Sequence, residues 1–349
     1  MSFIDFGNPF LQLALKIIVV LLVPLGTLPL IIHVERRGAG FIQNRVGPNR
    51  VGPFGLLQPL ADVVKFMFKE EALPSHVRPF FYFISPALAL LLALLPLAGI
   101  PFFGPIQING VQVFPEIFRT ELGILYVFAA TTLGPHAILL AGWASNNKYT
   151  VLGSIRACAQ MMSYELSMSS VVVTMLLVYN SQDFHTMSLF QNSTWFGIIP
   201  KWGIFMQPIA ATLFLVGIFA ESNRLPFDLA EGESELVAGY HLEYSSMKFA
   251  MFFMAEYIHV IGLSMVFIFL FLGGYHVPWV DLSSIANFIP LIQIGSLLGK
   301  TALMVWLFIW VRWSLPRFRY DHLMKLGWNI MLPLSLVNFI ITVFYLYLM

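Results

Sequence analysis

The segment from Glu221 to Glu243 gathers acidic side chains within an otherwise apolar sequence. Its 23 residues hold six of the chain's eighteen carboxylates but only one Lys or Arg residue, Arg224. The six carboxylates belong to Glu221, Asp228, Glu231, Glu233, Glu235 and Glu243. Neighbouring anions repel one another, which tends to raise the pKa of some of them. The segment is therefore a candidate for proton-transfer chemistry.

The alternative is a solvated acidic loop, which is the usual explanation of a charge run. Two features of the segment favour a functional role. Apolar residues alternate with the acids, so parts of the segment should pack against other elements: Leu225, Phe227, Leu229, Leu236 and Tyr240. Long apolar runs also flank it, and ionisable groups beside or within membrane spans are functional candidates.

Two further carboxylates lie inside apolar runs. Glu165 follows Arg156 by nine residues, and Glu256 follows Lys248 by eight. At about 1.5 Å of rise per residue, both would lie roughly 12–14 Å below the membrane surface. A carboxylate at that depth is costly, so we expect both to be functional. His259 could pair with Glu256 three residues earlier, or could be a packed interior histidine.

The composition is that of a membrane protein. Of the 349 residues, 58% are hydrophobic and 11% are charged, whereas a soluble domain is about one-quarter charged. We therefore predict an all-α polytopic membrane protein with a single integral domain, residues 1–349. The net charge of +1 gives no indication of nucleic-acid binding.

The sequence offers no cofactor site of its own. Cys158 is the only cysteine, whereas an iron–sulfur cluster needs about four ligands. Neither GxxxxGK[ST] nor GxGxxG occurs, so the sequence contains no recognisable phosphate-binding loop. We expect no cofactor on this chain, and any redox group should belong to a partner.

Apolar runs of about 20 residues predict membrane spans. Eight are expected, at roughly 9–33, 80–103, 121–144, 156–179, 202–220, 248–273, 287–311 and 327–348. Fifteen Lys and Arg residues lie in or at the edges of the odd-numbered connections: 34–79, 145–155, 221–247 and 312–326. The even-numbered connections and both termini carry only Arg119 and Lys201. The positive-inside rule therefore predicts that both termini lie outside.

The first inside loop contains a second kind of motif. Two Val-Gly-Pro units between residues 46 and 53 predict turns, and Pro59 suits the start of a helix. From there, apolar and charged residues separate onto two helical faces, so residues 57–69 should form an amphipathic helix in the membrane interface.

Several of these stretches resemble one known family. They are ERR (35–37), QNRVGPNRVGPFGLLQPLADVVKF (43–66), GWASNNKY (142–149), RACAQMMSYELS (156–167), AESNRLPFDLAEGESELVAGYHLEYSSMKFAMFFMAEY (220–257) and LPRFRYDHLMKLGW (315–328). Together they resemble membrane subunit 1 of respiratory complex I, the proton-pumping NADH:quinone oxidoreductase; bacterial members are known as the H subunit. The matches occur in order over nearly the whole chain.

The resemblance implies a subunit that connects the redox arm of the complex to its proton-pumping membrane arm. It implies quinone as the substrate, with FMN and iron–sulfur clusters on partner subunits. The implied partners are the peripheral-arm subunits around the quinone site, small membrane-arm subunits and membrane lipid. The expected location is the bacterial inner membrane, with the mitochondrial inner membrane as the alternative.

The resemblance also implies roles for individual residues. The quinone tunnel would be lined by Glu35, Arg36, Arg45, Asp62 and Lys65. A proton relay would use Asp228, Glu231, Glu233 and Glu235 in the acidic loop, followed by Glu221, Glu165 and Glu256. Structural roles would fall to Arg224 in that loop and to Arg317 and Arg319 in the last inside loop.

The third span departs from the family pattern. Some members carry a glutamate at the position that Thr132 occupies here, so a proton-path residue on this span is in question. His136, or a water admitted by a kink at Pro135, could replace it.

Two other functions are compatible with buried carboxylates. A stand-alone ion or proton transporter would also place them at the midplane, but the two halves of the sequence share no acidic or Gly-Pro motif. A subunit of a membrane-bound hydrogenase-type complex is the other alternative, against which the intact tunnel motifs argue.

Overall fold

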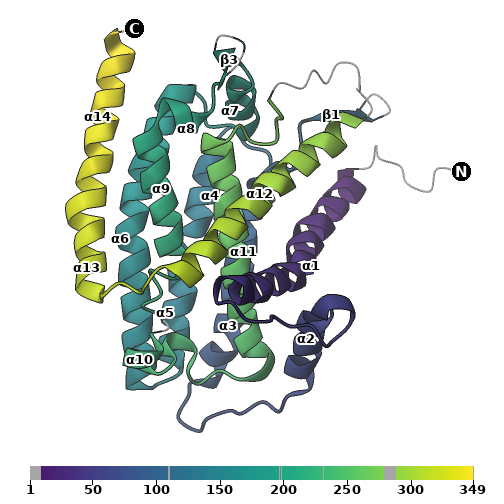
Figure 1. Cartoon of the computed structure of the whole chain (residues 1–349), viewed down its shortest axis with the longest axis vertical. Coiled ribbons are helices and arrows are strands. Elements are labelled where there is room, and N and C mark those ends of the chain that lie inside the picture. The colour runs from purple at the N-terminus through teal and green to yellow at the C-terminus, as the bar shows by residue number, and fades with distance from the viewer. Residues whose placement is uncertain are drawn as a thin grey trace, which may run out of the picture.

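The computed structural model describes residues 9–108, 111–195, 197, 199–230, 232–278 and 288–348, and it confirms an all-α polytopic architecture. Among these residues, seven helical segments are long and apolar enough to cross a membrane. They are Phe10–Ile42, Pro79–Gly99, Gly123–Ala144, Lys148–Tyr179, Ser246–Phe271, Ile289–Ser314 and Tyr320–Leu348. Figure 1 shows them as one bundle.

The helices and strands follow one another along the chain in a fixed order. The helices are α1 (Pro9–Ile42), α2 (Gln58–Phe68), α3 (Pro79–Leu94), α4 (Gly123–Thr131), α5 (Gly134–Ala144), α6 (Lys148–Tyr179), α7 (Phe184–Gln191), α8 (Gly203–Met206), α9 (Pro208–Glu221), α10 (Glu233–Leu236), α11 (Ser246–Phe271), α12 (Ile289–Ser314), α13 (Tyr320–Lys325) and α14 (Leu332–Leu348). Short 3₁₀ turns occupy Pro53–Gly55, Leu95–Gly99 and Gly239–His241, and a π-helical turn, Leu326–Met331, joins α13 to α14. Two antiparallel hairpins pair β1 (Ile106–Ile108) with β2 (Val111–Val113) and β3 (Thr194–Trp195) with β4 (Ile199–Pro200).

The predicted span at 202–220 differs from a single membrane-crossing helix. It is divided into α8 and α9 at Gln207, whose backbone is not helical. Pro208 follows, and a proline disfavours the helical conformation in the residue before it. α9 alone has 14 residues, fewer than the roughly 20 that a perpendicular crossing needs. The segment therefore contains a shorter apolar helix rather than one continuous helix, and its role as the fifth of eight predicted spans stays a prediction.

The predicted third span is also interrupted. α4 ends at Thr131 and α5 begins at Gly134, with Pro135 in the first turn of α5. Proline lacks an N–H and is tolerated at the start of a helix because the first N–H groups have no intrahelical partner. The two halves nevertheless continue one another over Gly123–Ala144.

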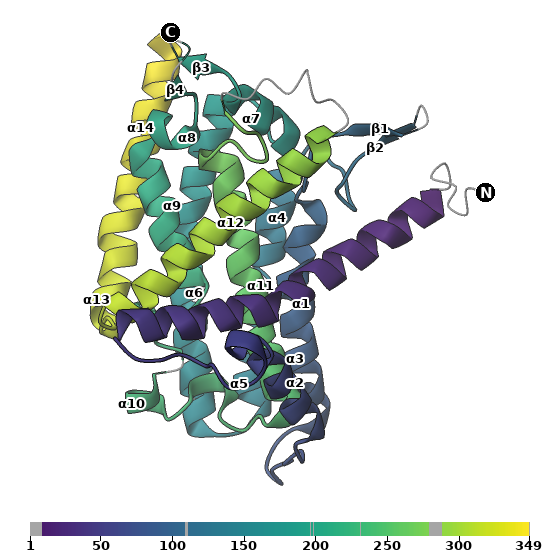
Figure 2. The same cartoon turned by 45° about the vertical axis from the view of Figure 1, so that its right-hand side comes forward.

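Helix α11 is the centre of the bundle. In its most apolar stretch 78% of the residues are buried, against 22% in the corresponding stretches of α1 and α14. Both α1 and α12 cross α11 obliquely and contact each other (Figure 2). Many large apolar side chains of α1 and α14 are exposed, as expected of helices that face lipid or partner subunits.

The amphipathic helix predicted at 57–69 is present as α2. It contacts both α1 and α11, and the Ser246 hydroxyl donates hydrogen bonds of 2.9 Å to the carbonyls of Phe66 and Lys69. These bonds join the end of α2 to the beginning of α11. Leu60, Val64 and Met67 remain exposed on its outer face.

Candidate functional site

A cavity of about 650 Å³ lies between α1, α2, α11 and the C-terminal end of α12. Each helix contributes one face. The side chains from α1 are Leu28, Ile32 and Glu35, which occupy the i, i+4 and i+7 positions that share a helix face. α11 contributes Phe249, Phe253 and Tyr257, which follow one another at four-residue intervals.

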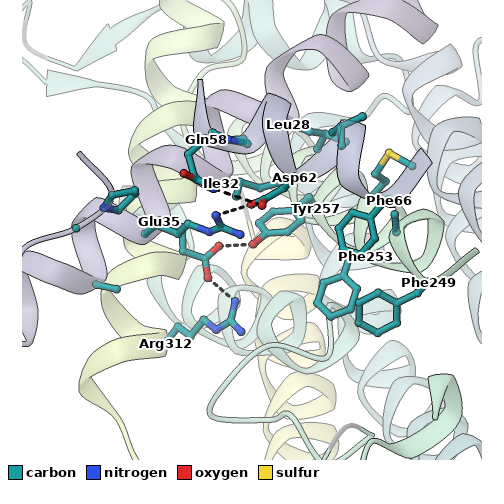
Figure 3. Close-up of a pocket in the computed structure, with 18 of the residues that line it drawn as sticks. Leu28, Ile32, Glu35, Gln58, Asp62, Phe66, Phe249, Phe253, Tyr257 and Arg312 are labelled. Atoms are coloured by element: carbon teal, nitrogen blue, oxygen red, sulfur yellow. Dashed lines mark hydrogen bonds and ion pairs between the residues drawn. The ribbon is translucent and has the colours of Figure 1, made fainter. Parts of the chain in front are cut away.

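The cavity has an apolar part and a polar end. Figure 3 shows Phe66, Phe249 and Phe253 grouped together, with Glu35 and Arg312 at the opposite end and with Asp62 and Tyr257 between the two groups. Such a pocket suits a ligand that has a long apolar portion and a polar head, because a few convergent polar groups fix the orientation of the head.

Glu35 is the centre of the polar end, and 6% of it is exposed. The Tyr257 hydroxyl donates a hydrogen bond of 2.5 Å to its Oε2, and the Arg312 guanidinium donates one to its Oε1. Arg224 Nη1 lies 3.9 Å from the same Oε1, and the Arg224 guanidinium lies 4.1 Å from the centre of the Tyr257 ring. A buried carboxylate is tolerated when it is paired in this way.

Asp62 and Arg36 form a second ion pair on the cavity wall. Arg36 Nη1 donates to Asp62 Oδ2 at 2.6 Å, and Gln58 approaches the other carboxylate oxygen at 3.5 Å. Arg45 also lines the cavity, with its Nε donating to Gln43 Oε1. Of the five residues predicted along a quinone tunnel, Glu35, Arg36, Arg45 and Asp62 therefore share this cavity.

Lys65 is the fifth of those residues, and it is not among the lining side chains. It is exposed on α2, with its amine 4.7 Å from the centre of the Phe66 ring. The helical face of α2 that reaches the cavity carries Pro59, Asp62, Val63 and Phe66, so Lys65 is turned away from it.

Arg224 connects this polar end to a second group of carboxylates. Its Nη2 lies 3.8 Å from Glu256 Oε2, and the Tyr240 hydroxyl donates a 2.9 Å hydrogen bond to Glu256 Oε1. Glu256 in turn borders a smaller cavity of about 50 Å³, together with Glu221 and His259. The structure thus brings Glu35, Glu256 and Glu221 into one connected region.

The contacts of His259 differ from the pairing considered for it. Its Nε2 lies 3.5 Å from Glu221 Oε1 rather than beside Glu256. Glu165, on α6, is half-buried and near enough to Glu221 for their charges to interact. The carboxylates therefore follow the spatial order Glu35, Glu256, Glu221, Glu165.

The start of the acidic loop is fixed by a buried side chain of α6. Gln160 Nε2 donates hydrogen bonds to the carbonyls of Ala220 and Phe227 at 2.7 Å and to Asn223 Oδ1 at 3.3 Å. These contacts place Arg224 and Asp228 in the interior, with 7% of each residue exposed. Burial raises the pKa of Asp228 to about 6, although Arg317 donates a 3.0 Å hydrogen bond to it.

The remaining predicted residues lie farther from the cavities. Glu235 pairs with Arg156 at 2.7 Å and is exposed. Arg319 pairs with Asp321 at the surface. Glu233 begins α10, where only the backbone is described, and Glu231 lies outside the described residues. Arg224 is the only Lys or Arg within the acidic segment, but Arg156 and Arg317 also reach this segment from other elements.

Tyr257, Arg312 and Tyr240 were not predicted as site residues. Tyr257 continues the spacing of Phe249 and Phe253, so a polar residue ending an apolar helix face was a usable signal. Arg312 gave no such signal, because it reaches Glu35 from 277 positions away in the sequence. Tyr240 was recognised only as a packing residue.

Comparisons with known proteins agree with this architecture. A family model described as NADH dehydrogenase matches residues 15–343. The chain is 41% identical to the NADH-quinone oxidoreductase H subunit of Bdellovibrio bacteriovorus, over 95% of each chain. It is 44% identical to NADH-quinone oxidoreductase subunit 8 of Rhodothermus marinus, over 90% of this chain and 91% of the relative. The second NADH-quinone oxidoreductase H subunit of Koribacter versatilis is 43% identical, over 95% of this chain and 96% of the relative.

Proposed function

Because the chain belongs to the NADH dehydrogenase family and is a multi-pass membrane subunit of NADH-quinone oxidoreductase, we propose that its large cavity is the quinone chamber of that complex. The single observation that carries the proposal is the form of the cavity, apolar along most of its wall and ending at Glu35, Tyr257 and Arg312. A volume of about 650 Å³ lies within the usual range of roughly 300–1,000 Å³ for ligand sites. Family membership disfavours a stand-alone transporter, and the names of these relatives favour quinone over hydrogenase-type chemistry.

The chain would supply binding and charge, while the electrons would come from elsewhere. Its single cysteine cannot hold an iron–sulfur cluster, so the iron–sulfur clusters of the complex would lie on partner subunits, where the family resemblance also implies FMN. The apolar wall would hold the isoprenoid tail of the quinone. Arg36, Asp62 and the Glu35 cluster would face the head group on its way to those subunits.

Reduction of the quinone changes the charge in the chamber. A reduced head group carries negative charge until it takes up two protons, and a nearby anion raises the pKa of neighbouring carboxylates. Arg312 and Arg224, which balance Glu35 in the present structure, would also be attracted toward that anion. The weakened pairing would make Glu35 and Glu256 better proton acceptors, because both lie beside Arg224.

The spatial order of the carboxylates suggests the direction in which a proton would move. A proton taken up by Glu256 would pass toward Glu221 and Glu165, and from there to neighbouring membrane subunits. Asp228 is placed to respond to the same event, since it is buried in the loop that carries Arg224. We place this machinery in a bacterial inner membrane, because the relatives named above are bacterial.

The chamber is tested with Asp62→Asn and Arg36→Ala. Each should lower quinone reduction by about tenfold or more, because the 2.6 Å ion pair on the chamber wall is lost. Electron transfer from NADH to a soluble acceptor that takes electrons from the peripheral arm should be retained. Asp321→Asn, an exposed aspartate outside the cavity, is the matched control. Equal loss of both activities in assembled complex would contradict a role in the quinone chamber.

The relay is tested with Glu256→Gln and Glu165→Gln, which keep the side-chain volume and remove the titrating proton. Quinone reduction and proton pumping should fall together by about tenfold or more, since tightly linked turnover stops when a proton step is blocked. The measurement is pumping in vesicles that contain a quantified amount of complex. Parental pumping by both variants would show that no obligatory proton path passes through these carboxylates.

A further inference from the structure

The cavity of about 50 Å³ between Glu256 and Glu221 contains an additional titratable group. Its wall includes Ala89 and Ala93 of α3, Gly134 and Ile138 of α5, and Met161 of α6, none of which can carry a proton. The titratable groups on this wall are Glu221 at the end of α9, Tyr240 in the acidic segment, and Glu256 and His259 on α11. His259 is therefore the only imidazole among the described residues of this wall.

The third span supplies no proton carrier to the same cavity from its described side chains. Thr132 is not on the wall, and its hydroxyl donates a 2.9 Å hydrogen bond to the Ala129 carbonyl. His136, the replacement considered from the sequence, is exposed and is also absent from the wall. The break between α4 and α5 instead brings the small residue Gly134 to the cavity.

His259 borders this cavity and approaches Glu221. It shares a face of α11 with Glu256, three residues earlier, and both side chains border the cavity. Its Nε2 lies 3.5 Å from Glu221 Oε1, and 3% of Glu221 is exposed. Within the described part of the chain, neither His259 Nε2 nor Glu221 Oε2 has a hydrogen-bond partner.

Unsatisfied buried polar atoms of this kind are usually bridged by water or used in chemistry. A volume of about 50 Å³ exceeds the roughly 10–15 Å³ that one water requires. Imidazole is suited to proton transfer because it can accept a proton on one ring nitrogen and release the proton from the other.

We propose that His259 is the proton carrier between Glu256 and Glu221, in a cavity to which the described side chains of the third span contribute no titratable group. A proton leaves the Glu256 carboxyl group through water in the cavity and binds one imidazole nitrogen. The proton on the other nitrogen then passes to Glu221, and the imidazole returns to its neutral form. The inference rests on the proposed function, because it assigns one step of the relay.

The test uses purified complex in proteoliposomes. His259→Gln and His259→Asn keep a polar side chain but cannot titrate, and His136→Gln is the matched control on the third span. Both His259 variants should lose roughly tenfold or more of the linked quinone reduction and pumping per assembled complex. The remaining activity should show a changed pH profile, since the titrating imidazole has been removed, while His136→Gln should match the parent.

The possible outcomes separate this inference from the proposed function. If both His259 variants, normalised to assembled complex, keep the parental rate and pH profile while Glu256→Gln is inactive, the relay stands and His259 is not part of it. If Glu256→Gln and Glu165→Gln are also fully active, the relay itself is refuted. A lower yield of complex with parental activity per complex would assign His259 a purely structural role and overturn the inference.

Discussion

At the residue scale, the site depends on how a buried charge is balanced. Glu35 is held by Tyr257 and Arg312, with Arg224 close by. Removing one member of a buried ion pair costs about 3–5 kcal/mol because the remaining charge is left without compensation. Removing both charges costs much less. Comparing the single variants with the double variant therefore distinguishes a pair whose charges compensate each other from two side chains that stabilise the complex independently.

Glu35 and Arg312 should therefore behave non-additively. Arg312→Met and Glu35→Gln should each lower the thermal stability of the assembled complex, whereas the double variant should recover much of that loss. The measurement is a double-mutant cycle on thermal inactivation of the complex. Arg224 moderates the effect of losing Arg312, since it remains near the carboxylate. Losses that simply add would show that the two side chains do not compensate each other.

At the same scale, chemistry was easier to predict from the sequence than contacts were. Glu165 and Glu256 could be selected because carboxylates within apolar runs are costly, and Glu221 because it begins the acidic segment. Glu35 and Asp62 were selected only through the family resemblance. Their partners could not be identified in the same way. A local spacing rule can relate His259 to Glu256, but it cannot show that the imidazole instead faces Glu221 on another helix.

At the element scale, the acidic loop depends on close contact between a helix and a turn. A Cβ added at Gly153 of α6 would lie 2.9 Å from the Gly239 Cα and 3.0 Å from the Tyr240 backbone nitrogen. Backbone atoms cannot move aside as readily as the end of a side chain. The neighbouring Tyr240 donates to Glu256, so this contact also positions a relay carboxylate.

We therefore predict that Gly153→Ala destabilises the loop by about 1–3 kcal/mol, the usual cost of overpacking, and lowers quinone-linked pumping. Gly26→Ala in α1 is the matched control, because a Cβ there meets nothing within 4 Å. Thermal inactivation and pumping of the assembled complex measure the two effects. Equal behaviour of the two variants would contradict the importance of the contact between α6 and the Gly239–His241 turn.

Long elements were largely predictable, and interruptions within them were not. Hydropathy locates a helix such as α11 because most of its 26 residues are apolar. The division at Gln207 depends on a single X-Pro step. The sequence contains 21 prolines, and Pro24 and Pro29 lie inside α1 without ending it. Whether neighbouring groups satisfy the backbone near a given proline is decided by tertiary packing.

At the scale of the whole molecule, the charge distribution predicts the orientation. The inside loops are expected to carry fifteen Lys and Arg residues, against two in the other connections and the termini. The beginning of α1 and the end of α14 both point away from the face that carries α2 and α10 (Figures 1 and 2). The sidedness of these faces in the membrane stays a prediction from charge.

A reporter that is active only in the cytoplasm should therefore be inactive when fused after the last residue, and a reporter that requires export should be active there. The same pair of reporters inserted in the loop at 69–78 should give the opposite result. Cytoplasmic activity of the C-terminal fusion in a complex-containing membrane would contradict the predicted orientation.

The site as a whole could not be assembled from the sequence. The expected tunnel residues were drawn from positions 35–65 and the relay residues from 165–256, as two separate groups. The structure joins them through Arg224, which approaches both Glu35 and Glu256. That connection depends on how α1, α11, α12 and the acidic loop pack together, which no local pattern encodes.

The contact between Glu35 and Arg312 also bears on how the protein is made. These residues are 277 positions apart, so at roughly 5–20 residues per second a ribosome reaches Arg312 about 14–55 s after Glu35. During that interval α1 carries a carboxylate whose Arg312 partner does not yet exist. We therefore expect the end of α1 that carries Glu35 to remain near the aqueous surface, and α1 to pack against the other helices late in folding. α1 lies obliquely across the outside of the bundle (Figure 2), and we expect it to dock only after α12, which carries Arg312, has been made.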